Sequence, residues 1–171
     1  MWWIGTAPEH EPLLDPVCRQ VNHAFGRPVL RIDDPRRPSD TLDPRRSQHS
    51  SGEILRWLAK LRPGQRLLAV TDVDLFVPVL TFVFGEAQLG GHAALVSTAR
   101  LMPDDGPALL RARLAKEAVH ELGHTLGLTH CPDHGCAMAR SATLYDVDRK
   151  NAWLCTDCRS LLEDRERGGT S

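Results

Sequence analysis

The sequence lacks the features that mark membrane, secreted and nucleic-acid-binding proteins. None of its apolar runs approaches the roughly 18 residues of a membrane-spanning helix, and the longest, residues 75–84, is interrupted by Pro78. The formal net charge is −1, without the basic excess typical of nucleic-acid binding. The first residues have neither the basic start nor the apolar core of a secretory signal. We therefore expect a cytoplasmic protein with no membrane or nucleic-acid partner.

Cysteine is also scarce, with five in 171 residues. Four of them form closely spaced pairs, which in a reducing compartment are more often metal ligands than disulfides. Cys18 stands alone and is expected to be a buried, inert thiol. The chain's length fits one domain, residues 1–171, and its 42% hydrophobic and 25% charged residues are typical of soluble globular proteins. We expect a monomer.

Residues 120–131, HELGHTLGLTHC, carry the strongest chemical signal. His120 and His124 lie four positions apart in a segment with helical periodicity, so both imidazoles lie on one helix face and can bind one metal ion. Glu121 follows the first histidine, and its carboxylate can reach a metal-bound water without being a ligand. Gly127 tolerates the positive φ that ends a helix, and the chain beyond it can return His130 to the same ion.

Three imidazoles leave the fourth position of zinc open for water, which is typical of a catalytic zinc site. Glu121 would take a proton from the zinc-bound water and pass it to the leaving amine of a cleaved peptide bond. One alternative is that these histidines are surface residues in an accidental pattern. Another is a catalytically weak or inactive, zinc-organised peptide-binding module, although such a module has no need of Glu121.

The four paired cysteines indicate a second metal site. Cys131 and Cys136 form CxxxxC, and Cys155 and Cys158 form CxxC after 18 intervening residues. Two thiolate pairs are the ligand set of a closed structural zinc site. A disulfide or a redox CxxC is the alternative, disfavoured because no thioredoxin-like strand precedes Cys155. His134 is a less favoured substitute for one cysteine.

The pattern HExxHxxGxxH with Met138 downstream resembles the metzincin metallopeptidases. The cysteines that follow the third histidine resemble those of the archaemetzincins, a branch with an added structural zinc. Further similarity lies in TDVDLF at 71–76 and FVFGEA at 82–87, and at three single residues, Ser141, Asp148 and Lys150. The resemblance spans about residues 67–160.

The resemblance implies a zinc metallopeptidase with two zinc ions per chain, one catalytic and one structural. It further implies a Met-turn at Met138 beneath the histidines and, in some members, aminopeptidase-like action on short peptides. In metzincins an edge strand pairs with the extended substrate, and the resemblance gives this role to about residues 92–98. Tyr145 is a weaker candidate to stabilise the oxyanion.

Apolar periodicity predicts an α/β protein. Helices are expected over residues 12–25, from Ser50 or Ser51 to Pro63, and from Pro107 through the histidines. Strands are expected at 2–6, 29–32, 66–72, 80–87 and 91–101, and a loop at 33–49. With the resemblance, this predicts a zincin-like fold. It would have a twisted, mixed five-stranded sheet, about three helices including the active-site helix, an upper subdomain of about 1–127 and a zinc-stabilised C-terminal lobe of about 128–171.

Overall fold

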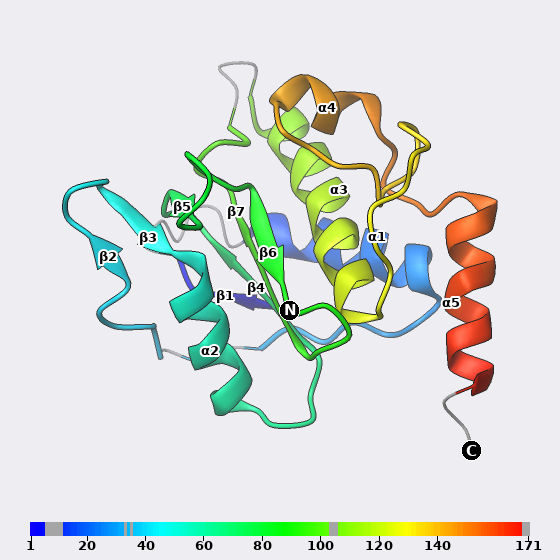
Figure 1. Cartoon of the computed structure of the whole chain (residues 1–171), viewed down its shortest axis with the longest axis horizontal. Coiled ribbons are helices and arrows are strands. Elements are labelled where there is room, and N and C mark those ends of the chain that lie inside the picture. Colours follow the sequence, from blue (N-terminus) through cyan, green and yellow to red (C-terminus); the bar gives the residue numbers. More distant parts are fainter. Residues whose placement is uncertain (6–11, 33, 35, 103–105, 169–171) are drawn as a thin grey trace.

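The computed structural model describes residues 1–5, 12–32, 34, 36–102 and 106–168 (Figure 1). Its main sheet has four strands in the order β1-β4-β7-β6. Strands β1 (Trp2–Trp3), β4 (Leu67–Thr71) and β7 (Ala93–Ser97) are parallel, and β6 (Gly85–Ala87) is antiparallel to β7. The mixed α/β fold is confirmed.

Helices cover both faces of this sheet. Helices α1 (Leu14–Phe25) and α3 (Pro107–Thr125) share one apolar core with alternate strand residues such as Val70 and Val96. Helix α2 (Ser51–Leu61) shares the other core with Ala69 and Leu95, which point to the opposite face. Strands β4 and β7 are thus buried on both sides, as their continuous apolar sequences predict.

Helix α2 begins and ends where its sequence predicts. The hydroxyl of Ser50 accepts a hydrogen bond from the backbone N–H of Glu53, which caps the helix. The helix ends at Leu61, two residues before Pro63. The predicted N-terminal position of Pro107 in α3 is also confirmed.

The strand arrangement differs from the predicted single five-stranded sheet. Residues 29–32 form no strand, because only Ile32 makes an isolated bridge, to Trp2. Residues 80–87 contribute only β6, since a turn follows Pro78 and only Val83 makes a further bridge.

A second, three-stranded sheet lies partly in the predicted loop. Its strands are β2 (Leu42–Asp43), β3 (Gln48–Ser50) and β5 (Leu75–Phe76), in that order. Sequence patterning missed all three strands because each is only two or three residues long. Residues 33 and 35 of the predicted loop and residue 6 of the first predicted strand lie outside the described residues.

The edge strand nearest the histidines is β6 rather than the predicted residues 92–98. Strand β7 lies between β4 and β6, so both of its edges are paired. Strand order depends on tertiary packing, which the local sequence pattern does not encode. Among the described residues, β6 (Gly85–Ala87) pairs on one side only, so it has a free edge.

The last part of the chain packs against α3 and α1 with little regular structure. It contains α4 (Leu144–Arg149) and α5 (Thr156–Gly168), which bring the number of helices in the described chain to five, against about three expected. Val147 and Leu162 from these helices join the core shared by α1 and α3. Among the described residues, no helix is long and apolar enough to cross a membrane.

Candidate metal centres and cleft

Three histidines converge at the end of α3. His120 and His124 lie one turn apart on the helix, and their Nε2 atoms are 3.1 Å from each other. The ring centroid of His130 lies 5.3 Å from that of His120 and 5.0 Å from that of His124. One potential ligand atom from each histidine lies within 4.8 Å of the other two.

Gly127 makes this convergence possible. Its φ of +87° lies in the left-handed region, and its backbone N–H donates to the carbonyl of His124 as the helix ends. Leu128 then donates to the carbonyl of Gly123, which closes the reversal. The chain turns back and brings His130 to the other two rings, as the sequence predicts.

Backbone carbonyls orient two of the rings. Nδ1 of His120 donates to the carbonyl of Ala137, and Nδ1 of His124 donates to that of Leu128, each at 2.8 Å. These bonds hold the proton on Nδ1 and leave Nε2 as the electron-pair donor, the usual outer-shell arrangement around a metal. Burial lowers the pKa of His120 well below its usual value, and the charges of Lys150 and His124 act in the same direction. The free imidazole is thus neutral and ready to bind.

The spacing of the nitrogens fits zinc. Tetrahedral zinc with bonds of about 2.0–2.1 Å places its nitrogen ligands about 3.3 Å apart. The 3.1 Å between the Nε2 atoms of His120 and His124 is close to this value. His130 is exposed, so the side of the triad it closes faces solvent and the cleft.

Glu121 lies beside the triad and is 4% exposed. Its carboxylate lines the same cleft as the three histidines. Burial raises the pKa of Glu121 well above its usual range; the neighbouring Glu117 raises it further and Lys150 opposes the shift. A cation bound by the three histidines would act against this shift, because a nearby positive charge favours the ionised carboxylate.

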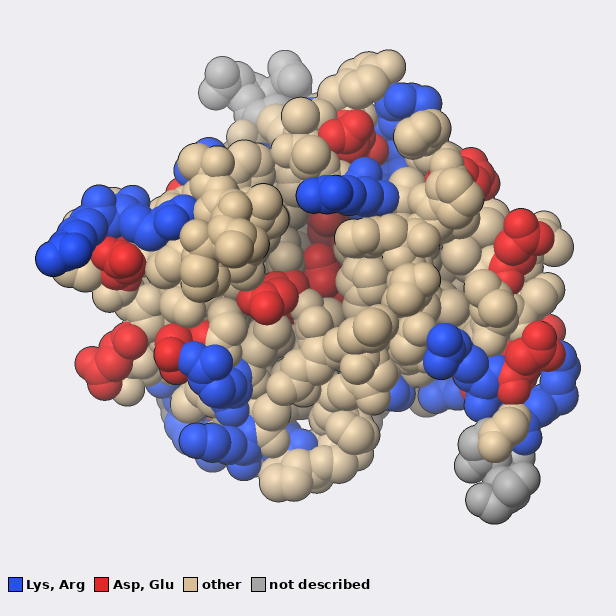
Figure 2. Space-filling view, viewed as in Figure 1, with Lys and Arg blue, Asp and Glu red and all other residues tan. Residues whose placement is uncertain are grey.

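The cleft has a volume of about 420 Å³. Residues 80–87, including the free edge of β6, form one wall, and Arg140, Ser141 and Ala142 form another. Glu117 and the triad lie between these walls. Figure 2 shows a hollow in this face with acidic side chains inside it.

Met138 lies beneath the histidine-bearing turn of α3. It is fully buried, and a β-carbon added to Gly123 would lie only 2.3 Å from its sulfur. The glycine in HELGH therefore permits close contact between the helix and Met138, as expected of a Met-turn. The preceding residue, Ala137, accepts the hydrogen bond from His120.

The four paired cysteines form a second cluster. Their sulfurs lie within 4.8 Å of one another, with 3.8 Å between those of Cys131 and Cys155. Tetrahedral zinc with Zn–S bonds of about 2.3 Å places sulfurs about 3.8 Å apart. All four cysteines are free of disulfides, and the exposed His134 is not part of the cluster.

Short backbone links connect the two clusters. Cys131, directly after His130, donates from its N–H to the carbonyl of Met138. Cys136 accepts hydrogen bonds at its sulfur from the N–H groups of Met138 and Cys155. The segment that carries Met138 is therefore held by the cysteines on one side and contacts His120 on the other.

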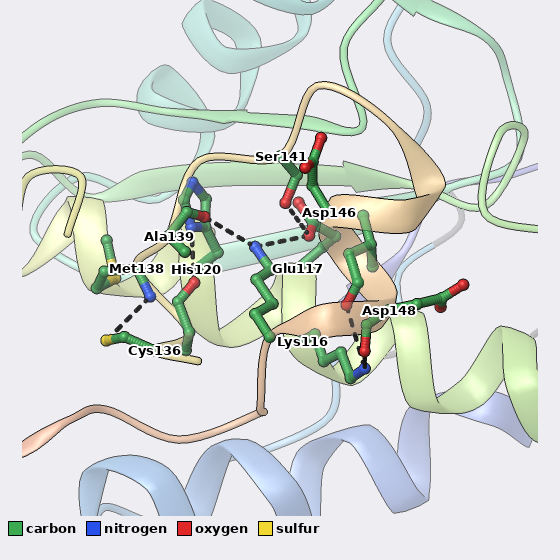
Figure 3. A network of polar contacts seen from close by, with 12 residues as sticks. Lys116, Glu117, His120, Cys136, Met138, Ala139, Ser141, Asp146 and Asp148 are labelled. Carbon is green, nitrogen blue, oxygen red and sulfur yellow. Dashed lines mark hydrogen bonds and ion pairs between the residues drawn. The ribbon is translucent and has the colours of Figure 1, made fainter. Parts of the chain in front are cut away.

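Sequence reasoning missed a polar network beside the cleft (Figure 3). Glu117 forms a 2.8 Å ion pair with Lys150 and accepts a hydrogen bond from Ser141. Ser141 and Lys150 are part of the family resemblance, but no role followed from it. A signal was available for Glu117, because it lies four residues before Glu121 on the buried face of the helix.

Two other residues considered from the sequence lie away from the centre. Tyr145 is 67% exposed on α4, where Arg149 packs over its ring, and it does not line the cleft. His92 is exposed at the start of β7 and joins neither cluster.

The chain is similar to proteins of known family over nearly its whole length. Residues 58–164 match the sequence model of Peptidase family M54. The chain is 37% identical over 167 residues to an archaemetzincin of Methanopyrus kandleri, covering 96% of this chain and 95% of that protein. The crystal structure of archaemetzincin from M. kandleri matches with a TM-score of 0.86 at 35% identity, covering 97% of this chain and 93% of that one. A zinc-dependent peptidase from Methanocorpusculum labreanum also gives a TM-score of 0.86, at 31% identity and coverage of 94% and 97%.

Proposed function

Because the chain belongs to peptidase family M54, the archaemetzincins, it is a zinc metallopeptidase acting on peptide substrates, and we propose which residues perform the reaction. His120, His124 and His130 hold the catalytic zinc, and Glu121 is the general base. Cys131, Cys136, Cys155 and Cys158 hold a second, structural zinc.

The observation that carries this proposal is the direction of the imidazole nitrogens. Carbonyl partners engage Nδ1 of both His120 and His124, so their Nε2 atoms point to one place, which His130 also faces. Three nitrogen ligands leave one zinc position for the reaction. Zinc bound by the three histidines would polarise the peptide carbonyl as a Lewis acid and would lower the pKa of a coordinated water.

Glu121 moves the proton. Its carboxylate accepts the proton of the attacking water and then donates it to the amine of the leaving peptide. The low exposure of the side chain keeps bulk water from competing for this proton.

The free edge of β6 is suited to hold the substrate backbone. Phe84 and Gln88 use their backbone groups to bond β7, through Ser97 and Ala93. In an antiparallel pair the bonded residues alternate, so the N–H and C=O groups of the residues at 85 and 87 point away from β7, toward the cleft. An extended peptide can pair with them as an added strand.

The size of the cleft supports short peptides as substrates. A volume of about 420 Å³ lies at the lower end of the range of small-molecule sites. We propose cleavage of short peptides, with the aminopeptidase-like mode that the family resemblance implies.

The rest of the molecule supports the site. An upper subdomain of about 1–127 provides the sheet and α3, and a lobe of about 128–171 provides His130, Met138 and the cysteines. The five free cysteines favour a reducing compartment, consistent with the cytoplasm. We also propose a monomer, which light scattering of the purified protein would test.

A peptide panel tests the proposed function. Aminoacyl substrates and internally quenched peptides are incubated with the wild-type protein, with and without chelator, and with Glu121→Gln. Cleavage that is lost with chelator and returns with zinc is expected. Glu121→Gln should keep its zinc and lose about 10²–10⁴-fold in kcat. Wild-type turnover in this variant would contradict the role of Glu121.

A peptide-binding module is the rival reading. Peptide binding without cleavage by the wild-type protein, unaffected by chelator, would favour it over the hydrolytic mechanism.

A further inference from the structure

A buried ion pair lies beside the catalytic centre without a part in the proposed proton transfer. Nζ of Lys150 is 2.8 Å from Oε1 of Glu117, and their side chains are 0% and 3% exposed. Burying two charges has a large desolvation cost, and apolar residues in their place are often equally stable or more so. Stability is therefore a weak explanation for the pair.

Glu117 is placed to meet the substrate. It lies four residues before Glu121 on α3, hence about one helical turn away on the same face. Both carboxylates line the cleft. A substrate group that contacts Glu117 would therefore lie next to the residues that would surround the scissile bond.

Two neighbours fix the Glu117 carboxylate. Ser141, on the opposite wall, donates its hydroxyl hydrogen to Oε1 at 3.1 Å. Lys150 bonds the same oxygen and also donates to the carbonyl of Ala139 at 3.3 Å. Figure 3 shows Glu117 and Ser141 facing each other, with Ala139 on the adjoining segment. The carboxylate is thus tied to the wall that carries Ala139 and Ser141.

The second carboxylate oxygen of Glu117, Oε2, is available to accept a hydrogen bond from a ligand. Among the described residues, none donates a hydrogen bond to Oε2, although the whole residue is only 2% exposed. Since Glu117 lines the cleft, this acceptor can be reached from the cleft. Oε2 is not among the buried side-chain atoms that lack a partner in the described part of the chain, so it is open to the cleft. A ligand that displaces water from this acceptor loses affinity unless it supplies a donor in its place.

The charge of the pair selects the kind of donor. Lys150 already neutralises Glu117, and Arg140 together with the proposed zinc offsets Glu86 and Glu121, which line the same cleft. An incoming ammonium or guanidinium group would therefore add positive charge beside the buried Lys150. An incoming carboxylate would offer no donor to Oε2. A neutral hydroxyl or amide group satisfies the acceptor without adding charge.

We propose that Glu117 is a specificity-determining residue, positioned by Lys150 and Ser141, that accepts a hydrogen bond from the substrate. Its subsite takes a side chain with a neutral donor, such as that of serine, threonine or asparagine, in a residue flanking the scissile bond. The place of that bond rests on the proposed function; the subsite itself is a binding property.

Peptide affinity tests the subsite without turnover. Zinc-loaded Glu121→Gln protein is titrated with peptides in which each position in turn carries serine, threonine, asparagine, alanine, valine, lysine or aspartate. At one position, the neutral donors should bind about ten- to hundredfold more tightly than alanine or valine. Affinities within threefold at every position, or a preference for lysine or aspartate, would overturn the proposal.

A matched variant locates the effect. Glu117→Leu with Lys150→Met, in the same background, removes both charges together and so avoids an unpaired buried ion. It should bind zinc as before and show no preference for neutral donors; a preserved preference would overturn the assignment to Glu117. Should this variant fail to fold, Ser141→Ala provides the test, with a severalfold smaller preference expected and an unchanged one contradicting the proposal.

Wild-type turnover on the same peptides separates the two proposals. Selective binding of neutral donors without cleavage would contradict the peptidase mechanism and still support the subsite. Cleavage with no selectivity at any position would support the peptidase mechanism and contradict the subsite.

Discussion

The carboxylate of Glu121 occupies the space that a side chain at Gly85 would need. A β-carbon added to Gly85 would lie 2.7 Å from Oε1 of Glu121 and 2.6 Å from the carbonyl oxygen of Leu95. Both distances are shorter than van der Waals contact. The glycine thus allows β6, the free edge of the sheet, to lie directly against the residue proposed as the general base.

Gly85→Ala should damage catalysis more than zinc binding. The added methyl group must move either Glu121 or β6 away from β7, and such overpacking costs about 1–3 kcal/mol. We expect kcat/KM to fall at least about tenfold, because small displacements in an active site are costly. Zinc content should stay unchanged in the purified variant.

Gly52→Ala is the matched control. A β-carbon at Gly52, in α2, would meet only Arg56, at 3.9 Å. This substitution should leave kcat/KM unchanged and slightly raise the free energy of unfolding. Wild-type activity in Gly85→Ala would show that the contact with Glu121 has no part in the reaction.

The local parts of the site could be predicted from the sequence. The spacing of His120 and His124 depends only on helix geometry, and the reversal at Gly127 depends on one backbone conformation. The pairing of cysteines within CxxxxC and CxxC is also local. Such short-range features depend only on residues close together in the sequence, so they can be predicted without knowledge of the fold.

The long-range parts could not be predicted. Glu117 and Lys150 are 33 positions apart, and nothing in the sequence near Lys150 indicates that its ammonium group is buried. The resemblance predicts the substrate-pairing edge at residues 92–98, whereas in the structure β6 is the edge strand beside the cleft, because strand order follows from packing on α2 and α3. Residues 29–32 have a strand-like sequence but form only one isolated bridge, between Ile32 and Trp2.

Cys155→Ser should weaken both metal sites. The sulfur of Cys136 is bonded by the N–H groups of Cys155 and Met138, and Ala137 beside it accepts the bond from His120. Loss of the structural ion removes folding energy from this segment. We expect a lower melting temperature and easier loss of the histidine-bound zinc to chelator.

Cys18→Ser is the control for this variant. Cys18 lies in α1 near Met1 and belongs to neither cluster. It should keep both zinc ions, with at most a small loss of stability. A well-folded Cys155→Ser protein with full zinc at the histidines would contradict the proposed coupling.

Lys150→Met should be destabilising on its own and much less so together with Glu117→Leu. The single change leaves the buried carboxylate of Glu117 without its counter-ion, which costs about 3–5 kcal/mol. The double change removes both charges and should recover most of the lost free energy of unfolding. Urea unfolding of the two variants measures the difference, and equal stability would argue against a buried, coupled pair.

After the exchangeable zinc is removed, His120 should lower the free energy of unfolding in acid, and the raised pKa of Glu121 should act in the opposite direction. Burial, with Lys150 and His124, lowers the pKa of His120 well below 6.5, whereas the unfolded chain takes up this proton near pH 6.5. The unfolded state therefore binds more protons between these two values. As pH falls below about 6.5, the free energy of unfolding should drop by up to about 1.4 kcal/mol per pH unit from this residue. Above about pH 6.5, His120 does not make the free energy of unfolding depend on pH.

Urea unfolding at pH 7.5 and 5.5 measures this dependence. His120→Gln cannot take up the proton, so its zinc-free form should lose less stability over the same interval. Parallel losses in the two proteins would exclude His120 as the source.

Zinc analysis during chelator titration tests the central claim most directly. The purified protein should contain two zinc ions per chain. One ion should leave first, together with peptidase activity, and its return should restore that activity; in His120→Gln only the slowly released ion should be present. A single zinc per chain in the wild-type protein, or removal of the exchangeable ion with activity unchanged, would contradict the assignment of the three histidines to a catalytic zinc.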